Sequence, residues 1–283
     1  MKNFFKSLGK ALLYFCVFLA IQLLVSFVFS IVISAGVMVK LGASATEAQI
    51  AEAMAKLESE IMGYSTLIAM ISNILSLAVV WLAFKIRKKK LCEQIELRKC
   101  DFKMLFCATL CGISFSILSS TVVQMIPFPD SIVESFAESH GALSKGNPIV
   151  GFISVVFLAP IVEEIFFRGL IHTRLKKGMN TVAAAIVSSL LFGVMHGEII
   201  WIMATFLMGI MLVWVFEKTK SLLPCISIHV LNNAVAQLTS EVSEITGWGA
   251  AVVCAVFVVL FVLSAFYIIK NSKQKHAVIT ETE

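Results

Sequence analysis

Charged residues are scarce in this chain: Asp, Glu, Lys and Arg make up 14% of its 283 residues, whereas 59% are hydrophobic. Soluble domains contain about 25% charged residues. The apolar residues lie in long blocks rather than in the stripes of amphipathic surface helices, which excludes a soluble globular domain. The composition therefore predicts an integral membrane protein.

Features of secreted and modular proteins are also missing. The 7 Cys are an odd number without metal-type spacing, which argues against a disulfide framework. We find no internal repeat and no low-complexity segment. The first apolar run follows Lys2, Lys6 and Lys10 and is too long for the core of a cleaved signal peptide. We expect it to be an uncleaved membrane span.

The apolar blocks predict an all-α, polytopic membrane bundle. A helix needs about 20 apolar residues to cross a bilayer. By this measure we expect about eight spans within one membrane domain, 1–283, and the fifth and seventh of them are short. The expected spans are 11–39, 63–86, 104–126, 148–168, 182–196, 199–216, 222–238 and 248–269.

The loop charges predict the orientation of this bundle. The net charge is +5, but the basic residues cluster beside the apolar blocks rather than on one surface, so no nucleic-acid partner is expected. With an even number of spans, every basic cluster lies on the same side as both termini. The acidic loops 47–60, 130–138 and 241–244 then lie on the other side. The positive-inside rule places both termini in the cytoplasm.

One acidic loop has a helical pattern. Ser44 and Glu47 have capping-box spacing, which marks the start of a helix. The apolar residues after them recur on one helical face: Ile50, Met54, Leu57 and Ile61. The pattern favours a short amphipathic helix on the outer surface, and an ordinary solvated loop is the alternative.

Ionisable residues within the apolar blocks concentrate in three of them. Each such residue costs roughly 2.5–3.5 kcal/mol on insertion scales, so it needs an explanation. The fourth block carries Glu163, Glu164 and Arg168. The fifth ends in His196, and the seventh carries His229 with Asn233 four residues later.

Helical spacing separates the two glutamates. Glu164 and Arg168 are four residues apart and can pair on one helical face, which offsets the cost of both. Glu163 is rotated away and has no charged partner on its own helix. Such a carboxylate needs a partner on another helix, a metal or a proton, and a desolvated carboxylate suits a general base. Gly193 and Gly197 bracket His196 at a spacing that allows close helix approach.

These residue types predict hydrolysis of a peptide bond by one of two mechanisms. A carboxylate with a His can activate water, while a second His with an Asn amide donates to the oxyanion. Alternatively, Glu163, His196 and His229 bind zinc as a three-ligand catalytic site. Each feature alone has a structural explanation as an ion pair or an interhelical hydrogen bond. The His-Glu-x-x-His, Gly-x-Ser-x-Gly and Gly-x-Gly-Asp signatures of other peptidases are absent.

Three motifs resemble those of the CPBP family, which comprises CAAX proteases and bacteriocin-processing enzymes and is also called the type II CAAX prenyl endopeptidase family. That family is recognised by Glu-Glu-x-x-x-Arg, Phe-x-x-x-His and His-x-x-x-Asn or His-x-x-x-Asp motifs. The matching residues here are Glu163-Glu164-Ile165-Phe166-Phe167-Arg168, Phe192-Gly193-Val194-Met195-His196 and His229-Val230-Leu231-Asn232-Asn233. The resemblance covers a core of about 148–238.

The resemblance implies an intramembrane peptidase. Glu163 and His196 would activate the water, His229 and Asn233 would stabilise the oxyanion, and Glu164 with Arg168 would be structural support. Members are described both as zinc metalloproteases and as glutamate peptidases, so the resemblance leaves the metal open. It implies a membrane-embedded or lipidated peptide substrate and location in a cell membrane, which we expect to be a bacterial plasma membrane.

Two other functions fit a membrane protein with this set of residues. The first is a non-catalytic bacteriocin-immunity or scaffold protein that keeps the motifs for structure. The second is a small transporter, which predicts inverted repeats that the sequence lacks. One geometric difficulty accompanies the peptidase hypothesis. Along straight helices with about 1.5 Å per residue, His229 lies about 12 Å and His196 about 24 Å from the inner face of the membrane, so the two do not lie at one depth.

Overall fold

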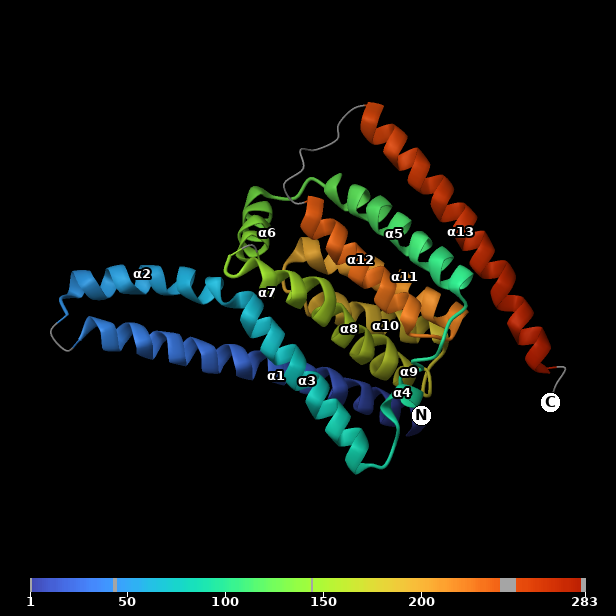
Figure 1. Ribbon diagram of the computed structural model, residues 1–283, viewed down its shortest axis with the longest axis horizontal. Helices are drawn as coiled ribbons and strands as arrows, with labels where there is room; N and C mark the ends of the chain where they lie inside the picture. The colour runs from blue at the N-terminus through green and yellow to red at the C-terminus, as the bar shows by residue number, and fades with distance from the viewer. Residues whose placement is uncertain (1, 43–44, 144, 240–247, 281–283) are drawn as a thin grey trace.

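The computed structural model describes residues 2–42, 45–143, 145–239 and 248–280, and these are helical with short connections (Figure 1). The α-helices are α1 (Lys2–Leu41), α2 (Glu47–Gly63), α3 (Ser65–Ile86), α4 (Leu91–Gln94), α5 (Phe102–Gln124), α6 (Asp130–Leu143), α7 (Pro148–Phe152), α8 (Ala159–Glu164), α9 (Thr173–Leu175), α10 (Thr181–Val194), α11 (Ile199–Thr219), α12 (Leu223–Thr239) and α13 (Trp248–Thr280). Two π-helical stretches, η1 (Ile153–Leu158) and η2 (Ile165–His172), join α7, α8 and α9 into one helix.

The structure is that of a polytopic helical membrane protein, as the hydropathy predicts. All eight expected segments are helical over most of their length. Within the described residues, six helices are long and apolar enough to cross a bilayer: Asn3–Leu41, Ser65–Ile86, Phe102–Gln124, Pro148–Leu175, Ile199–Thr219 and Ala251–Ser272. The fifth and seventh expected spans are α10 and α12, which have 14 and 17 residues and are shorter than a bilayer requires.

The helices surround the continuous helix Pro148–Leu175. On one side it packs against α12, and on the other against α1 and α3 (Figure 1). Helices α10 and α11 lie side by side, and α5 packs against α11 and α12. Helix α13 lies on the outer side of α5, at the edge of the bundle. The most buried part of the molecule is therefore the part that contains the three motifs.

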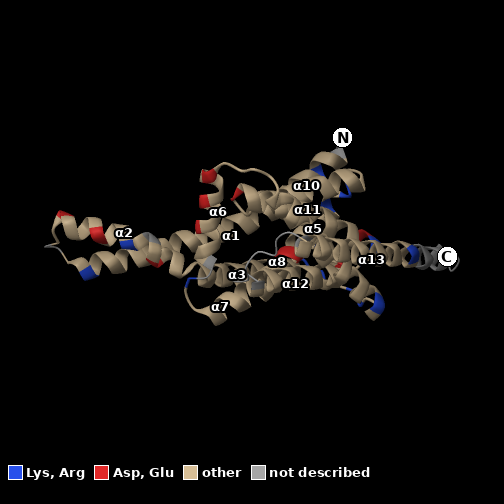
Figure 2. Ribbon diagram, turned by 90° about the horizontal axis from the view of Figure 1, so that it is seen from above, with Lys and Arg blue, Asp and Glu red and all other residues tan. Residues whose placement is uncertain are grey.

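Charge is distributed along the bundle as the loop pattern predicts. Figure 2 shows most Lys and Arg at the end that carries both termini, and Asp and Glu over α2 and α6 at the other end. The predicted acidic positions Glu241 and Glu244 lie outside the described residues. The separation of charge is consistent with the positive-inside rule, and the cytoplasmic location of the termini stays a prediction.

Helix α2 exists, but its cap differs from the expected one. Ser44 lies outside the described residues, and the N-cap of α2 is Thr46. The Thr46 hydroxyl accepts a bond from the Gln49 N–H at 3.3 Å, and the Gln49 side chain accepts one from the Thr46 N–H at 2.9 Å. The capping box therefore involves Thr46 and Gln49 rather than Ser44 and Glu47. Helix α2 packs against the far end of α1, and the two helices project together from the bundle (Figure 1).

The two glycines that bracket His196 have different roles. A Cβ on Gly193 would lie 2.9 Å from the Ile202 carbonyl oxygen, so this glycine allows α10 and α11 to approach closely. Gly197 has open space around it and a φ of +80°, so it allows a left-handed turn after His196. The expected close approach is confirmed for Gly193, and for Gly197 it is wrong.

We expect Gly193→Ala to destabilise the protein by about 1–3 kcal/mol, because the new methyl group meets backbone that cannot rotate away. Gly36→Ala is the matched control, since a Cβ at Gly36 meets nothing within 4 Å in the interior of α1. The control should be neutral or slightly stabilising, as alanine is the better helix former. Thermal unfolding in detergent compares the two, and equal unfolding temperatures would contradict the close packing at Gly193.

Candidate active site

The two glutamates lie in the irregular part of the helix Pro148–Leu175. They end α8, a six-residue α-helical segment between the π-helical stretches η1 and η2. Pro160, at the start of α8, has no N–H and cannot continue a regular hydrogen-bond ladder. Single-turn π-helical stretches within α-helices occur frequently at functional sites. The local sequence thus interrupts the regular backbone hydrogen bonding of this helix about one turn before Glu163.

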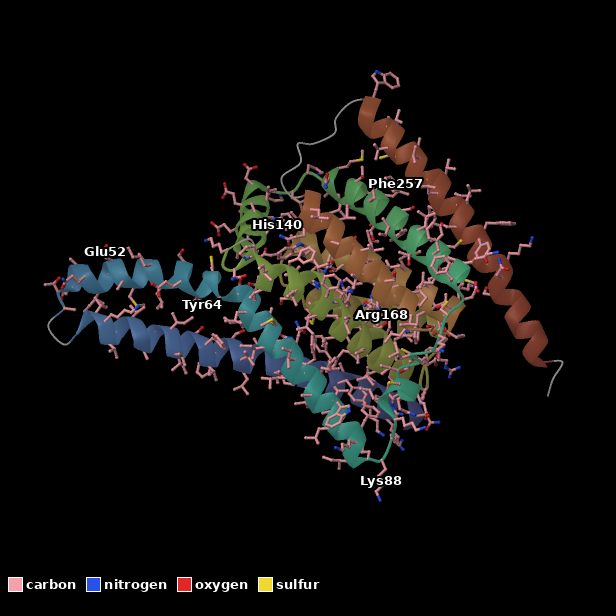
Figure 3. The ribbon with its side chains drawn as sticks, in the orientation of Figure 1. Glu52, Tyr64, Lys88, His140, Arg168 and Phe257 are labelled. Atoms are coloured by element: carbon pink, nitrogen blue, oxygen red, sulfur yellow. The ribbon has the colours of Figure 1, made fainter. Side chains whose placement is uncertain are left out.

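Glu164 is the centre of a buried polar group. Its Oε1 accepts a 2.7 Å bond from Arg168 Nη1 and a 2.9 Å bond from Nδ1 of His229. Arg168 Nη2 also lies 3.5 Å from the Gly209 carbonyl oxygen on α11. The relative exposures of Glu164, Arg168 and His229 are 0%, 1% and 2%, and Figure 3 shows Arg168 inside the bundle. The predicted Glu164–Arg168 pair is present. Its contacts with His229 and Gly209 link the helix Pro148–Leu175 to α12 and α11.

Glu163 is the more accessible glutamate. Its side chain is 13% exposed, and its Oε2 lies 3.7 Å from Nε2 of His229. Nδ1 of His229 faces Glu164, which can only accept, so Nδ1 carries a proton; Nε2 can donate toward Glu163 only when the ring carries a second proton. Glu163 thus faces a histidine of another helix beyond normal hydrogen-bond distance, and its expected partner, metal or proton stays a prediction.

His196 lies in the turn between α10 and α11. Its Nδ1 is 2.9 Å from the Phe192 carbonyl oxygen, so this nitrogen carries the proton and donates. Nε2 then has a free lone pair that can accept a proton or bind a metal. The residue is half-buried, whereas His229 is buried.

Phe192 holds the imidazole rings and the guanidinium group together. Its ring centroid is 5.0 Å from that of His196 and 5.7 Å from that of His229, both edge to face. The guanidinium carbon of Arg168 lies 4.3 Å from the centroid of the same ring. The fully buried Phe192 ring thus contacts both imidazoles and the guanidinium group, and the depths expected from straight helices stay a prediction.

Asn233 contacts the helix of the glutamates at a different point. Its Nδ2 donates to the Val155 carbonyl oxygen at 2.9 Å, and its Oδ1 accepts from Nδ2 of Asn232 at 3.4 Å. A carboxamide has two N–H groups, so one proton of Asn233 is free for another acceptor. The structure brings Glu163, Glu164, Arg168, His196 and His229 into one group and places Asn233 at its edge.

The predicted zinc ligands have suitable donor atoms but are not gathered as ligands. The carboxylate of Glu163 and Nε2 atoms of His196 and His229 are donors that zinc prefers, and the Glu164–His229 bond resembles the outer-shell bond of a metal-bound histidine. In the described part of the chain, however, no three His, Cys, Asp or Glu side chains lie close enough to hold a metal ion. Zinc at this site therefore stays a prediction.

A second polar cluster lies at the end of the bundle near the termini. Glu217 of α11 accepts bonds of 2.6 Å from both Lys176 and Lys220, and its Oε1 lies 2.8 Å from Nε2 of the buried His172. The sequence gives no signal for this cluster, because its members come from two segments, 172–176 and 217–220, that are more than 40 residues apart. It holds α9 to α11 and contains none of the motif residues.

Comparisons with known proteins match the part of the chain that contains the site. Residues 145–235 match the family model described as "Type II CAAX prenyl endopeptidase Rce1-like". Among curated proteins, "Putative membrane peptidase YdiL" of Bacillus subtilis is 29% identical over 86 residues. That alignment covers 30% of this chain and 35% of the relative, so the two are aligned over about a third of their lengths. No solved structure matches the chain.

The matched segment begins before α7 and ends within α12. It therefore contains all the predicted site residues: Glu163, Glu164, Arg168, His196, His229 and Asn233. The core of about 148–238 that the motifs predict overlaps this segment and stays a prediction. The helices before and after it, α1 to α6 and α13, lie outside the match. Residues 145–235, which contain the site, are therefore similar to the Rce1-like model of type II CAAX prenyl endopeptidases.

Proposed function

We propose that the protein is an intramembrane endopeptidase that hydrolyses a peptide bond with water activated by Glu163 and His196. One observation carries the proposal: the part-exposed carboxylate of Glu163 faces His229, whose other nitrogen is fixed by a buried Glu–Arg pair, and His196 contacts the same Phe192 ring as His229. Glu164, by contrast, is fully buried and paired with Arg168, as a structural residue can be. The Rce1-like match over the same residues supports this reaction class.

The residues fit the steps of hydrolysis. Glu163 takes a proton from water while Nε2 of His196 accepts a hydrogen bond from the second water hydrogen, so the resulting hydroxide attacks the peptide carbonyl carbon. Negative charge then develops on the carbonyl oxygen. The free amide proton of Asn233, and Nε2–H of His229 when its ring is doubly protonated, stabilise that charge. The carboxyl group of Glu163 finally donates its proton to the leaving amine as the C–N bond breaks.

The substrate we propose is a membrane-embedded or lipidated peptide or protein. The site lies within a bundle of apolar helices, so a substrate must reach it through the bilayer or from its surface. The proposed location is a bacterial plasma membrane with both termini in the cytoplasm, in agreement with the separation of charge in Figure 2. Prenylated C-termini and bacteriocin-type peptides are the two substrate classes to test.

The test is cleavage of quenched peptides, prenylated and plain, by the purified full chain in detergent. We expect cleavage of at least one class, and lipid-modified peptides should be preferred over plain peptides of the same sequence. Absence of cleavage across both classes would favour the non-catalytic immunity or scaffold function.

Zinc dependence is the second proposal for the same site, with Glu163, His196 and His229 as ligands. Metal analysis of the purified protein and cleavage after chelation decide it. Stoichiometric zinc that is lost in His196→Ala would support the metal mechanism. Metal-free protein with full activity would leave the glutamate mechanism.

A further inference from the structure

The helix of the glutamates has a gap in its backbone hydrogen bonds. Ala159 N–H donates to the Ser154 carbonyl oxygen, a bond that spans five residues as in a π-helix. The next bond in this register would join residue 160 to the Val155 carbonyl oxygen. Residue 160 is a buried proline, which has no N–H to donate. The Val155 oxygen thus has no backbone donor in this register.

The side chain of Asn233 supplies the missing donor. Its Nδ2 lies 2.9 Å from the Val155 oxygen, and only the NH₂ end of the amide can donate to a carbonyl. Asn232 donates to Oδ1 of Asn233 at 3.4 Å, which favours the same orientation of the amide. A carbonyl without a donor in an apolar environment is costly, so this bond has a clear physical purpose.

The same helix α12 also holds the next part of the site. His229, one turn before Asn233, contacts Glu164 at 2.9 Å, and Asn233 contacts Val155. Helix α12 therefore fixes the helix of the glutamates on both sides of Pro160. The segment between these two contacts, α8, carries Glu163.

We propose that Asn233 is a positioning residue: it replaces the hydrogen bond that Pro160 cannot make, and thereby fixes α8 so that Glu163 faces His229. The activity part of this inference rests on the proposed peptidase function, whereas its structural part does not. The inference gives Pro160 and Asn232 a role in the site, which no motif assigns to them. It also gives Asn233 a role besides donation to an oxyanion. The two roles predict different stability and activity for variants that combine changes at Asn233 and Pro160.

A double-mutant cycle of Pro160→Ala and Asn233→Ala separates these roles, because the Pro160→Ala change restores a backbone N–H for the Val155 oxygen. In the wild-type background, we expect Asn233→Ala to lower the unfolding temperature by about 4–8 °C. In the Pro160→Ala background, the same change should lower it by less than about 2 °C. Pro148→Ala is the matched control, since Pro148 begins α7, where no N–H is needed, and should give no rescue.

Activity provides the second readout. A positioning role predicts that Asn233→Ala reduces kcat at least about tenfold in the wild-type background and much less in the Pro160→Ala background. A role only as oxyanion donor predicts a loss of about 10²–10³-fold in both backgrounds and no coupling in stability, which would overturn the inference.

Failure of folding is also informative. If Asn233→Ala is recovered only as aggregate, the Pro160→Ala/Asn233→Ala protein should be recovered as a monodisperse species, and aggregation of both would contradict the inference. If the wild-type protein cleaves no peptide, the proposed function fails, but the stability cycle still decides whether Asn233 replaces the missing bond.

Discussion

Glu163→Gln is expected to reduce peptide cleavage by about 10²–10⁴-fold, which is the usual contribution of general acid–base catalysis. The amide has nearly the same shape as the carboxylate but cannot take a proton from water. Because the Glu163 side chain is part-exposed and makes no hydrogen bond within normal distance to His229, folding should be little affected. Initial rates on the quenched peptides, measured beside thermal unfolding, separate these two effects.

Glu138→Gln is the control for the loss of one negative charge. Glu138 lies on the exposed face of α6, outside the group of catalytic residues, so this variant should cleave at the wild-type rate. Substantial cleavage by Glu163→Gln at wild-type stability would remove Glu163 from the mechanism. A large loss of stability in that variant would instead assign Glu163 a structural role.

The fold was largely predictable because a bilayer imposes simple requirements on sequence. Apolar blocks of sufficient length predicted the helices, including the two short ones, α10 and α12. Hydropathy does not report the backbone register within a helix. The π-helical stretches η1 and η2 were therefore not predicted.

The candidate site was predictable to the extent that its contacts are local. The four-residue spacing predicted the Glu164–Arg168 bond, since such residues are neighbours on a helix. The contact of His229 with Glu164 joins residues 65 positions apart, and no sequence pattern encodes which nitrogen faces which carboxylate. Spacing on α12 predicted that His229 and Asn233 project together, yet they contact the neighbouring helix at different levels.

Phe192 illustrates a residue whose motif was recognised but whose role was not. The Phe-x-x-x-His pattern places Phe192 one turn before His196, so a contact between the two was foreseeable. Its contacts with Arg168 and His229 depend on the packing of α10 against two other helices. One aromatic ring thereby contacts residues from three different segments of the chain.

Arg168→Leu is expected to cause the largest loss of stability, about 3–5 kcal/mol, because it leaves a fully buried carboxylate without its counter-ion. Glu164 Oε1 would keep only the bond from His229, and its Oε2 has no hydrogen-bond partner among the described residues. Arg168→Lys retains the charge but not the planar group that stacks on Phe192, so its loss should be smaller. The unfolding temperatures of the wild-type protein, Arg168→Leu and Arg168→Lys in detergent measure these losses.

Two further variants show whether the unpaired charge, rather than lost packing, causes the effect. Glu164→Gln removes the charge while its Oε1 still accepts the proton of His229, so Arg168→Leu/Glu164→Gln should be more stable than Arg168→Leu alone. Lys56→Leu breaks the Glu52–Lys56 pair, which has the same four-residue spacing but is mostly exposed, and should leave the unfolding temperature unchanged. If the double variant were no more stable than Arg168→Leu, the guanidinium would act mainly through packing against Phe192. The ion pair would then be a consequence of that packing rather than what positions His229.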